Sequence, residues 1–329
     1  MEFPEFILNT SSLTQANPPD QQTVYDMLIL GGGPAAMSAA VYAARKMLNL
    51  AVLTLDFGGQ IKETWEVENY LGFQNINAND LADRFLEHVN SFHFPVGLGV
   101  AVKEVSKNDT IFIVTMEDGA CFMGKTVIYA AGERHRWLGI PGEKEFTGKG
   151  VTYCSVCDAP LYKDKRVVIV GGGNSAFTAA LDLLRGNAEI TMVNIVQGWQ
   201  ADAILQKRVK EYEKIEFLDS HEVIHIEGGK KVEGAVLRNR STGEEKRIFV
   251  DGIFVEIGLL PNSDPVRNLL KLNQEGEIIV DCTCRTDVSG FFAAGDVTVI
   301  PHKQIIVSAG EGAKAALSAY DYLVQTSQI

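Results

Sequence analysis

The sequence has few cysteines, no long apolar run and no excess of positive charge, and each absence excludes a class of protein. Five cysteines in 329 residues are too few, and odd in number, for a disulfide framework, so redox or metal chemistry better explains a close pair. No apolar run approaches the roughly 18 residues that indicate a membrane span. The net charge of −12 disfavours a general affinity for nucleic acid or for an anionic membrane.

The amino terminus also lacks the features of a targeting segment. Residues 1–23 are mostly polar, contain three prolines and have no basic start. We interpret them as an extension, and we expect no secretory signal and a cytoplasmic location. A content of 46% hydrophobic and 22% charged residues is typical of a globular chain, and the length predicts about two domains.

Two segments have the pattern of a dinucleotide-binding unit, in which a strand enters a glycine turn and leaves as a helix. In the first, an apolar run at 24–30 leads into GGGPAA and an alanine-rich stretch. In the second, a strand at 166–170 leads into GGGNSA, a helical stretch and a further strand at 189–193. The glycines let the backbone approach a pyrophosphate, and the helix N-terminus supplies N–H donors.

Two acidic residues support the same interpretation. Asp56 follows a strand expected at 50–55 and stands where a ribose hydroxyl is held. Near the carboxyl end, Gly295 and Asp296 form a third glycine-acid signal before another alanine-rich stretch. The pattern predicts an α/β fold with two nucleotide-binding, three-layer (ββα, Rossmann-like) domains, the second inserted into the first. We expect the first domain at 24–133 and 259–329, and the second at 134–258.

One pair of cysteines has a spacing that suits redox chemistry. Cys154 and Cys157 form CSVC, followed at once by Asp158. Such a pair can close a small disulfide, the spacing can lower a thiol pKa, and the adjacent carboxylate can carry protons. The alternative is half of a zinc site completed by Cys282 and Cys284, but their C-x-C spacing fits structural zinc sites poorly. We therefore expect no metal, and we expect Cys121, Cys282 and Cys284 to be ordinary packed thiols.

A second metal pattern, H-E-x-x-H, occurs at His221, Glu222 and His225. It binds zinc only on a helix, where both imidazoles share one face. Here alternating apolar residues and a glycine turn predict a strand. Both imidazoles would then point the same way but lie roughly 13 Å apart, too far to share one metal.

The motifs taken together resemble the low-molecular-weight thioredoxin reductases, a family of flavoprotein disulfide reductases. The resemblance covers residues 24–323 through GGGPAA, GGQ at 58–60, VENYLG at 67–72, AAG at 130–132, CSVCD, GGGNSA and AAGDV at 293–297. The last part, including IFVEIGLLPN, is also similar to the flavoprotein subunit of alkyl hydroperoxide reductase. That relative has an additional N-terminal thioredoxin-like domain, which we do not expect in a chain of this length.

The resemblance implies a cofactor, a partner and residue roles. It implies FAD, a thioredoxin-like protein substrate and a homodimer. Cys157 would lie against the flavin, Cys154 would attack the partner's disulfide, and Asp158 would donate a proton. The disulfide and the nicotinamide would have to take turns at the flavin. This would need a domain rotation about hinges near 132–137 and 258–262. The residues implied for FAD are Gly31, Gly33, Pro34, Ala35, Asp56, Gly59, Gln60, Asn69, Ala131, Gly132, Gly295, Asp296, Gln304 and Ile305.

The second dinucleotide site departs from the family pattern. Its implied residues are Gly171, Gly173, Asn174, Ser175 and Asn194. Relatives that select NADPH carry His and Arg after the following strand, because a 2′-phosphate needs positive charge. Residues 194–200 contain no cation, so we expect NADH rather than NADPH. Asn194, however, is neutral where an NADH site prefers an acid, so a donor other than a nicotinamide, such as ferredoxin, is an alternative. Two further alternatives are electron flow from the dithiol to the flavin and a non-enzymatic flavin-binding scaffold with structural zinc.

Overall fold

The computed structural model describes residues 17–63 and 66–329, whose contacts divide into two compact units. The first unit contains the described residues up to Lys62 together with Asn79–Arg134 and Leu260–Ile329. The second unit contains Glu63–Ala78 and His135–Leu259. Most of the predicted extension, residues 1–16, lies outside the described residues. Within the described part, no helix has the length and apolar character needed to cross a membrane.

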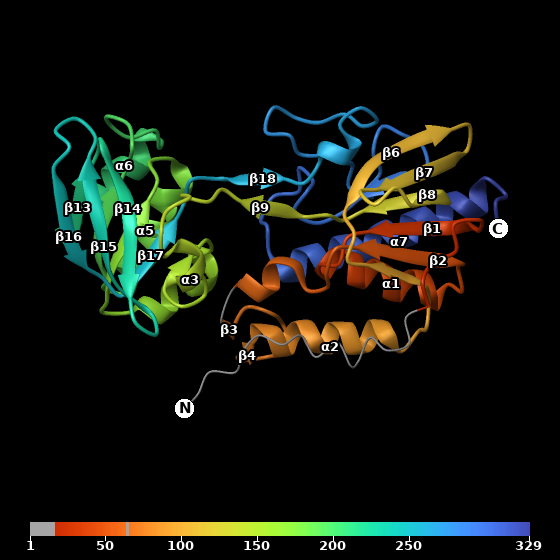
Figure 1. Ribbon diagram of the computed structural model, residues 1–329, viewed down its shortest axis with the longest axis horizontal. Coiled ribbons are helices and arrows are strands. Elements are labelled where there is room, and N and C mark those ends of the chain that lie inside the picture. The colour runs from red at the N-terminus through yellow and green to blue at the C-terminus, as the bar shows by residue number, and fades with distance from the viewer. Residues whose placement is uncertain (1–16, 64–65) are drawn as a thin grey trace. The chain divides into compact units, whose positions relative to one another are not determined.

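The first unit is built on a seven-stranded sheet (Figure 1). Its parallel part has the order β5-β2-β1-β8, and β19 also pairs with β8 in parallel. Strands β7 and β6 continue from β8 in antiparallel fashion. The strands are β1 (Val24–Leu30), β2 (Leu50–Thr54), β5 (Val96–Leu98), β6 (Val102–Asn108), β7 (Ile111–Met116), β8 (Cys121–Tyr129) and β19 (Phe291–Ala293).

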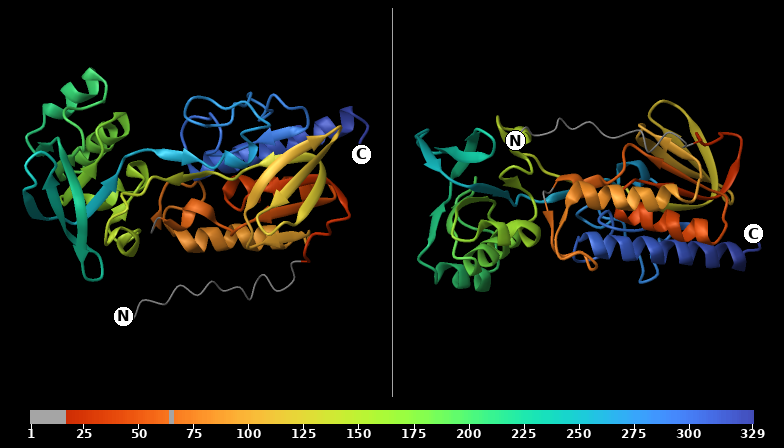
Figure 2. Two further views of the ribbon diagram at one scale, coloured as in Figure 1. Left: turned by 45° about the horizontal axis from the view of Figure 1, so that its top comes forward. Right: turned by 90° about the horizontal axis from the view of Figure 1, so that it is seen from below.

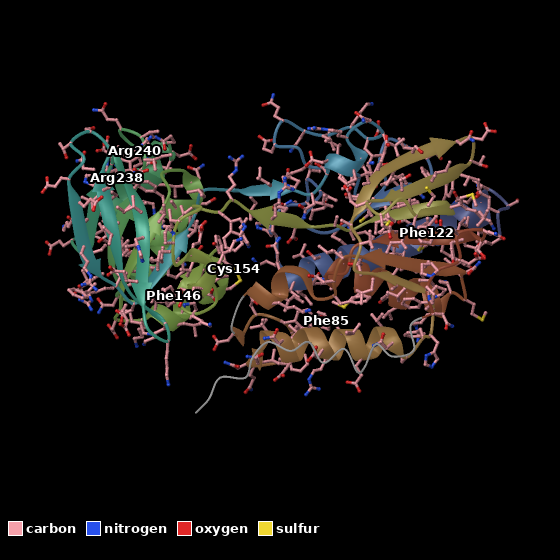
Figure 3. The ribbon with its side chains drawn as sticks, viewed as in Figure 1. Phe85, Phe122, Phe146, Cys154, Arg238 and Arg240 are labelled. Carbon is pink, nitrogen blue, oxygen red and sulfur yellow. A yellow bond between two sulfur atoms is a disulfide. The ribbon has the colours of Figure 1, made fainter. Side chains whose placement is uncertain are left out.

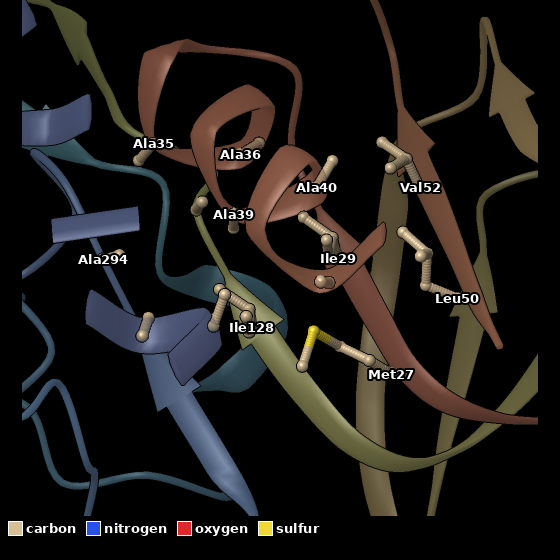
Figure 4. Packing of buried hydrophobic residues seen from close by; sticks show 14 of the residues in the cluster. Met27, Ile29, Ala35, Ala36, Ala39, Ala40, Leu50, Val52, Ile128 and Ala294 are labelled. Atoms are coloured by element: carbon tan, nitrogen blue, oxygen red, sulfur yellow. The ribbon is translucent and has the colours of Figure 1, made fainter. Parts of the chain in front are cut away.

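Three helices run alongside one another on one face of this sheet, as Figure 2 shows. They are α1 (Pro34–Arg45), α2 (Ala78–Asn90) and α7 (Ile305–Gln325). Apart from Met37, the buried residues of α1 are alanines, and they pack in one cluster with Met27 and Ile29 of β1 (Figure 4). Small side chains let α1 and α7 approach closely. Because α1 follows β1 after only three residues, its N-terminus lies at the carboxyl end of that parallel strand.

The second unit has three layers. Its five-stranded parallel sheet has the order β10-β17-β11-β12-β13, and an antiparallel sheet of β14-β15-β16 covers one face. Helix α5 packs on the other face, where Phe177 and Leu183 are fully buried. The elements are α3 (Glu143–Phe146), β10 (Val151–Thr152), α4 (Ser155–Asp158), β11 (Arg166–Val170), α5 (Asn174–Arg185), β12 (Glu189–Val193), α6 (Ala203–Lys210), β13 (Ile215–Leu218), β14 (His221–Gly228), β15 (Val232–Asn239), β16 (Glu245–Phe249) and β17 (Gly252–Val255).

These units confirm the predicted fold class. The strands expected at 24–30, 166–170 and 189–193 occur with those bounds, and the strand expected at 50–55 ends one residue early, at Thr54. The segment Glu63–Ala78 groups with the second unit. Its strands β3 (Glu66–Val67) and β4 (Ile76–Asn77) pair only with each other among the described strands, so no ladder ties them to the large sheet. Strands β9 (Glu133–His135) and β18 (Leu259–Pro261) form a separate ladder.

The H-E-x-x-H segment is a strand, as predicted, but its two histidines do not share a face. A β-bulge between Val223 and His225 shifts the register of β14 against β15. Val223 and Ile226, three residues apart, are consequently both buried, and His225 is exposed. The expectation of equal side-chain direction is therefore wrong, because the bulge inserts an extra residue into the alternation.

Candidate active site

The first glycine turn joins β1 to α1 through two very close backbone approaches. A Cβ at Gly31 would lie 2.2 Å from the Ala130 carbonyl oxygen, and one at Gly32 would lie 1.8 Å from that of Asp56. Gly31 also has a φ of +127°, which favours glycine. At Gly33, by contrast, a Cβ would meet no described atom within 4 Å. The first two glycines therefore allow packing, and the third leaves space beside the N-terminus of α1.

Several other residues predicted for FAD lie around this turn. The Gly58 N–H donates to the Gly32 carbonyl at 2.9 Å, which holds the Gly58–Gln60 loop against the turn. Gln60 Nε2 donates to the Glu133 carbonyl at 2.6 Å. On the opposite side, a Cβ at Gly295 would lie 3.0 Å from that of Ala35, and Asp296 Oδ1 accepts from Ser308 Oγ at 2.7 Å.

The remaining predicted FAD residues fall into two groups. Ala131 and Gly132 follow β8, Gln304 precedes α7, and Ile305 is the first residue of that helix. Asn69 is exposed and lies between β3 and β4 in the segment that groups with the second unit. The predicted FAD residues other than Asn69 therefore all belong to the first unit, and Asn69 belongs to the second.

A buried carboxylate lies among these residues. Glu133 Oε1 is 3.2 Å from Lys303 Nζ, which is also 2.9 Å from Glu277 Oε1. Burial raises the pKa of Glu133 to about 7, although Lys303 acts in the opposite direction. Sequence motifs gave no signal for Glu133, because the charged side chains that lie against it in the fold, Lys303 and Glu277, are more than 140 residues away in the chain.

The second glycine turn, between β11 and α5, repeats the geometry of the first. A Cβ at Gly171 would lie 2.3 Å from the Glu256 carbonyl oxygen, and one at Gly172 would lie 2.4 Å from Asn194 Nδ2. At Gly173, again, a Cβ would meet no described atom within 4 Å. Asn174 and Ser175 form the exposed first turn of α5. This space beside a helix N-terminus is suited to a phosphate group.

The loop after β12 folds back over this turn. The buried Asn194 donates through Nδ2 to the Gly198 carbonyl at 2.6 Å and to Gln200 Oε1 at 3.1 Å. The backbone N–H of Gly198 donates to Asp219 Oδ2 at 2.7 Å. The amide hydrogens of Asn194 are therefore engaged within the protein, and a carboxylate from the end of β13 lies against the loop.

Sequence reasoning missed one cation near this loop. Arg240, which follows β15, donates through Nη1 to the Ile195 carbonyl at 3.1 Å. The guanidinium also lies 3.8 Å from Glu222 Oε2, and Arg238 lies 2.6 Å from the other oxygen of the same carboxylate. Figure 3 shows both arginines on the second unit. Arg240 stands 45 residues from Ile195, and no spacing rule links such positions, so only the fold reveals this cation.

The paired cysteines lie in the second unit, where Cys154 caps the short helix α4 (Figure 3). Cys154 and Cys157 form a disulfide. The Cys157 N–H donates to Cys154 Sγ at 3.2 Å. Both cysteines are half-buried, whereas the side chain between them, Val156, is 57% exposed. The disulfide is therefore within reach of a reactant at the surface of its unit.

Two carboxyl groups flank this disulfide. Asp158 is buried and accepts a hydrogen bond from Thr152 Oγ1, and its own N–H donates to the Cys154 carbonyl at 3.1 Å. Glu256, just beyond β17, accepts hydrogen bonds from Ser155, and burial raises its pKa to about 7. The motif identified Asp158, but nothing in the sequence pointed to Glu256.

We expect Glu256→Gln to stabilise the protein at neutral and alkaline pH and not at acid pH. A carboxyl group whose pKa rises from 4.5 to about 7 on folding contributes stability that is full below pH 4.5 and is lost as the pH rises through 7. The substitution should raise the unfolding free energy by up to about 3 kcal/mol at pH 7 and above, with little change near pH 4. Thermal unfolding across pH measures this, with the exposed Glu244→Gln as control. An equal effect at both pH values would contradict the assignment.

The other cysteines correct one prediction. Cys284 is buried, as expected for a packed thiol, and donates to Glu311 Oε2 at 2.8 Å. Cys121 and Cys282 are exposed instead. Cys121 is the first residue of β8 and Cys282 lies in a turn, so neither side chain reaches an apolar cluster that could bury it. Among the described residues, no group of three His, Cys, Asp or Glu side chains is arranged to hold a metal.

Comparisons with known proteins agree with this geometry. The sequence family "Pyridine nucleotide-disulphide oxidoreductase" matches residues 25–316. The chain is 41% identical over 317 residues to the alkyl hydroperoxide reductase F subunit of Pseudomonas putida, a match that covers 95% of this chain and 61% of that protein. The chain thus spans about three fifths of the length of this curated relative.

Solved structures match over nearly their full length. The thioredoxin reductase of Streptococcus pyogenes has a TM-score of 0.87 and 36% identity, covering 92% of this chain and 99% of that one. Lactococcus lactis thioredoxin reductase, in its FR conformation, has a TM-score of 0.63 and 35% identity, with the same coverage. With two Rossmann-like units and a disulfide pair, the chain resembles the thioredoxin reductase structures and belongs to the pyridine nucleotide-disulphide oxidoreductase family.

Proposed function

We propose that the protein passes electrons from NADH through FAD and the Cys154–Cys157 disulfide to the disulfide of a thioredoxin-like protein. The observation that carries this proposal is the disulfide itself, half-buried beside the buried carboxyl of Asp158 in a chain with two dinucleotide-type glycine turns. The first turn would hold FAD and the second would hold the nicotinamide nucleotide.

The residues of the first unit fit FAD. Gly33 leaves open space at the N-terminus of α1, where a pyrophosphate can accept backbone N–H bonds. Asp56 follows β2 at the position of a ribose-binding acid, and Asp296 and Gln304 lie near the N-terminus of α7. When bound, FAD would supply the transfer of electrons between nicotinamide and disulfide.

The second unit would supply the thiol chemistry. Cys154 attacks the partner's disulfide once the pair is reduced, and Cys157 then displaces the partner by closing the bond to Cys154. Asp158 holds the proton that moves during this exchange, and its hydrogen bond from Thr152 fixes the carboxyl beside α4. The exposed Val156 offers an apolar contact for the incoming protein.

The charges near the second glycine turn favour NADH over NADPH. The Asp219 carboxylate lies against the loop and would repel a 2′-phosphate. Arg240 is the nearby cation, but Glu222 partly neutralises it. A 2′-hydroxyl needs no such positive charge.

We expect the enzyme to use NADH at least about tenfold better than NADPH in kcat/KM. Arg240→Ala should leave the NADH value unchanged and lower the NADPH value several-fold, while Asp219→Asn should raise the NADPH value. The control is Arg247→Ala, which removes an exposed arginine paired with Glu227 at 2.6 Å on the same sheet. Preference for NADPH in the wild type would contradict this assignment.

We also propose a homodimer and a domain rotation about two hinges. Gly132 and Gly258 both have positive φ, at +64° and +96°, and a Cβ at either position would meet no described atom closer than 3.9 Å. Glycines with this freedom can absorb large backbone changes. Each glycine adjoins the β9–β18 ladder, where the chain passes between the two units.

The proposed function is tested by anaerobic mixing of the flavin-loaded protein with NADH, NADPH or reduced ferredoxin, followed by an oxidised thioredoxin. Bleaching of the flavin by NADH and reduction of the thioredoxin disulfide support the proposal. If only ferredoxin bleached the flavin, the donor would be wrong while the disulfide relay would stand. If none of the three donors bleached the flavin, the proposed direction of electron flow, from donor through flavin to the protein disulfide, would be wrong.

A further inference from the structure

One oxygen atom of the first unit is buried without a partner. The Glu133 side chain is 3% exposed, and its Oε2 atom has no hydrogen-bond partner within the described part of the chain. An unsatisfied buried carboxylate oxygen is costly, typically by ~1–3 kcal/mol or more. In a native structure, a proton, a ligand or an ordered water compensates for the burial of such an atom.

The charges facing Glu133 do not fully compensate for its own charge. The ammonium of Lys303 lies 3.2 Å from Oε1. The same ammonium is shared with Glu277 Oε1 at 2.9 Å and donates to the Asp296 carbonyl at 2.8 Å. The carboxylates of Asp296 and Glu277 both disfavour ionisation of Glu133. The Lys303 ammonium is therefore shared by two carboxylates, and the Asp296 carboxylate adds a further negative charge.

Glu133 is also surrounded by residues proposed for FAD. Its carbonyl accepts from Gln60, it directly follows Gly132, and Lys303 directly precedes Gln304. Bound FAD would remove water from this cluster and add the negative charges of a pyrophosphate to the first unit. Both effects favour the neutral form of a carboxyl group. A protonated Glu133 could also donate through Oε2–H, whereas the ionised group can only accept.

We propose that Glu133 carries a proton in the FAD-loaded protein at neutral pH and that loss of this proton changes the absorption spectrum of the bound flavin. This inference rests on the proposed function, because it requires FAD in the first unit. Glu133 is a positioning residue in this scheme, since it acts through the charge it places near the cofactor.

The test is a pH titration of the visible spectrum of the purified, FAD-loaded full chain between about pH 6 and pH 9. The wild type should show a one-proton change in the flavin band at or above pH 7. Glu133→Gln should retain FAD and lose this change. Glu275→Gln, which alters an exposed residue near Glu277, should behave as the wild type. Lys303→Met removes the favourable cation and should move the change to higher pH.

The outcomes separate this inference from the proposed function. A wild type with no transition, or the same transition in Glu133→Gln, would overturn the role of Glu133 while leaving FAD binding intact. A protein that binds no FAD, as purified or after reconstitution, would overturn the proposed function and this inference with it. If Glu133→Gln does not fold, an unmoved transition in Lys303→Met overturns the proposal.

Discussion

Cys157→Ser should lower reduction of a protein disulfide by at least about 1000-fold, with flavin reduction by NADH left intact. Removing one member of a catalytic unit costs nearly as much as removing all of it, because the remaining group cannot complete the reaction. The disulfide joining Cys154 to Cys157 cannot form in this variant. Steady-state reduction of thioredoxin measures the loss, and stopped-flow bleaching of the flavin measures the step that survives.

The same variant distinguishes the roles of the two cysteines. Cys154 would still attack the partner in Cys157→Ser, but no resolving thiol would release it, so a mixed disulfide should accumulate. Cys154→Ser should be equally inactive and trap no partner. Cys282→Ser removes an exposed free thiol of the first unit and should keep full activity. Full activity in Cys157→Ser, or trapping by Cys154→Ser, would contradict the assigned order.

Gly312→Ala should destabilise the first unit strongly. A Cβ at Gly312 of α7 would lie 1.9 Å from the Ala35 carbonyl oxygen of α1, and that oxygen belongs to backbone that cannot rotate away. The two helices would have to separate, so we expect a loss of about 3 kcal/mol or more in unfolding free energy. Because both helices begin at the proposed FAD site, FAD should be lost as well.

Gly310→Ala is the matched control, since Gly310 lies in the same helix two residues earlier. A Cβ there would meet no described atom within 4 Å, and the residue is exposed. Alanine in a helix interior is favoured over glycine by up to about 1 kcal/mol, so this variant should be unchanged or slightly more stable. Chemical denaturation and the FAD content of both variants measure the contrast. Equal stability of the two would show that α1 and α7 do not pack this closely.

Local sequence patterns were sufficient to predict the framework of the fold. The strands at 24–30 and 166–170 were recognisable because an apolar run buried on both faces ends at a glycine turn followed by a small-residue helix. Close approaches at Gly31 and Gly171 explain why glycine is required at those turns. Alternation of apolar residues likewise predicted the strand at His221–Gly228.

Other features depend on contacts between distant residues, which no local pattern describes. The bulge in β14 depends on its register against β15, so alternation alone gave the wrong side-chain directions. Arg240 reaches the loop after β12 only through the antiparallel sheet. Glu133 meets Lys303 only where β9 passes the start of α7. The cysteine pair and Asp158 were visible in the sequence, but the buried carboxyl groups of Glu133 and Glu256 were not.

The central claim is that flavin and disulfide exchange electrons within one chain, and an anaerobic reductive titration tests it most directly. The wild type, titrated with dithionite and followed by its flavin absorbance, should accept two electrons per chain more than Cys157→Ser, because a disulfide takes two electrons. Free-thiol counting of the wild type should find two more thiols at the end point than before the titration, and no change in Cys157→Ser. Equal electron uptake by the two proteins, with bound flavin in both, would show that the Cys154–Cys157 disulfide is not part of the relay.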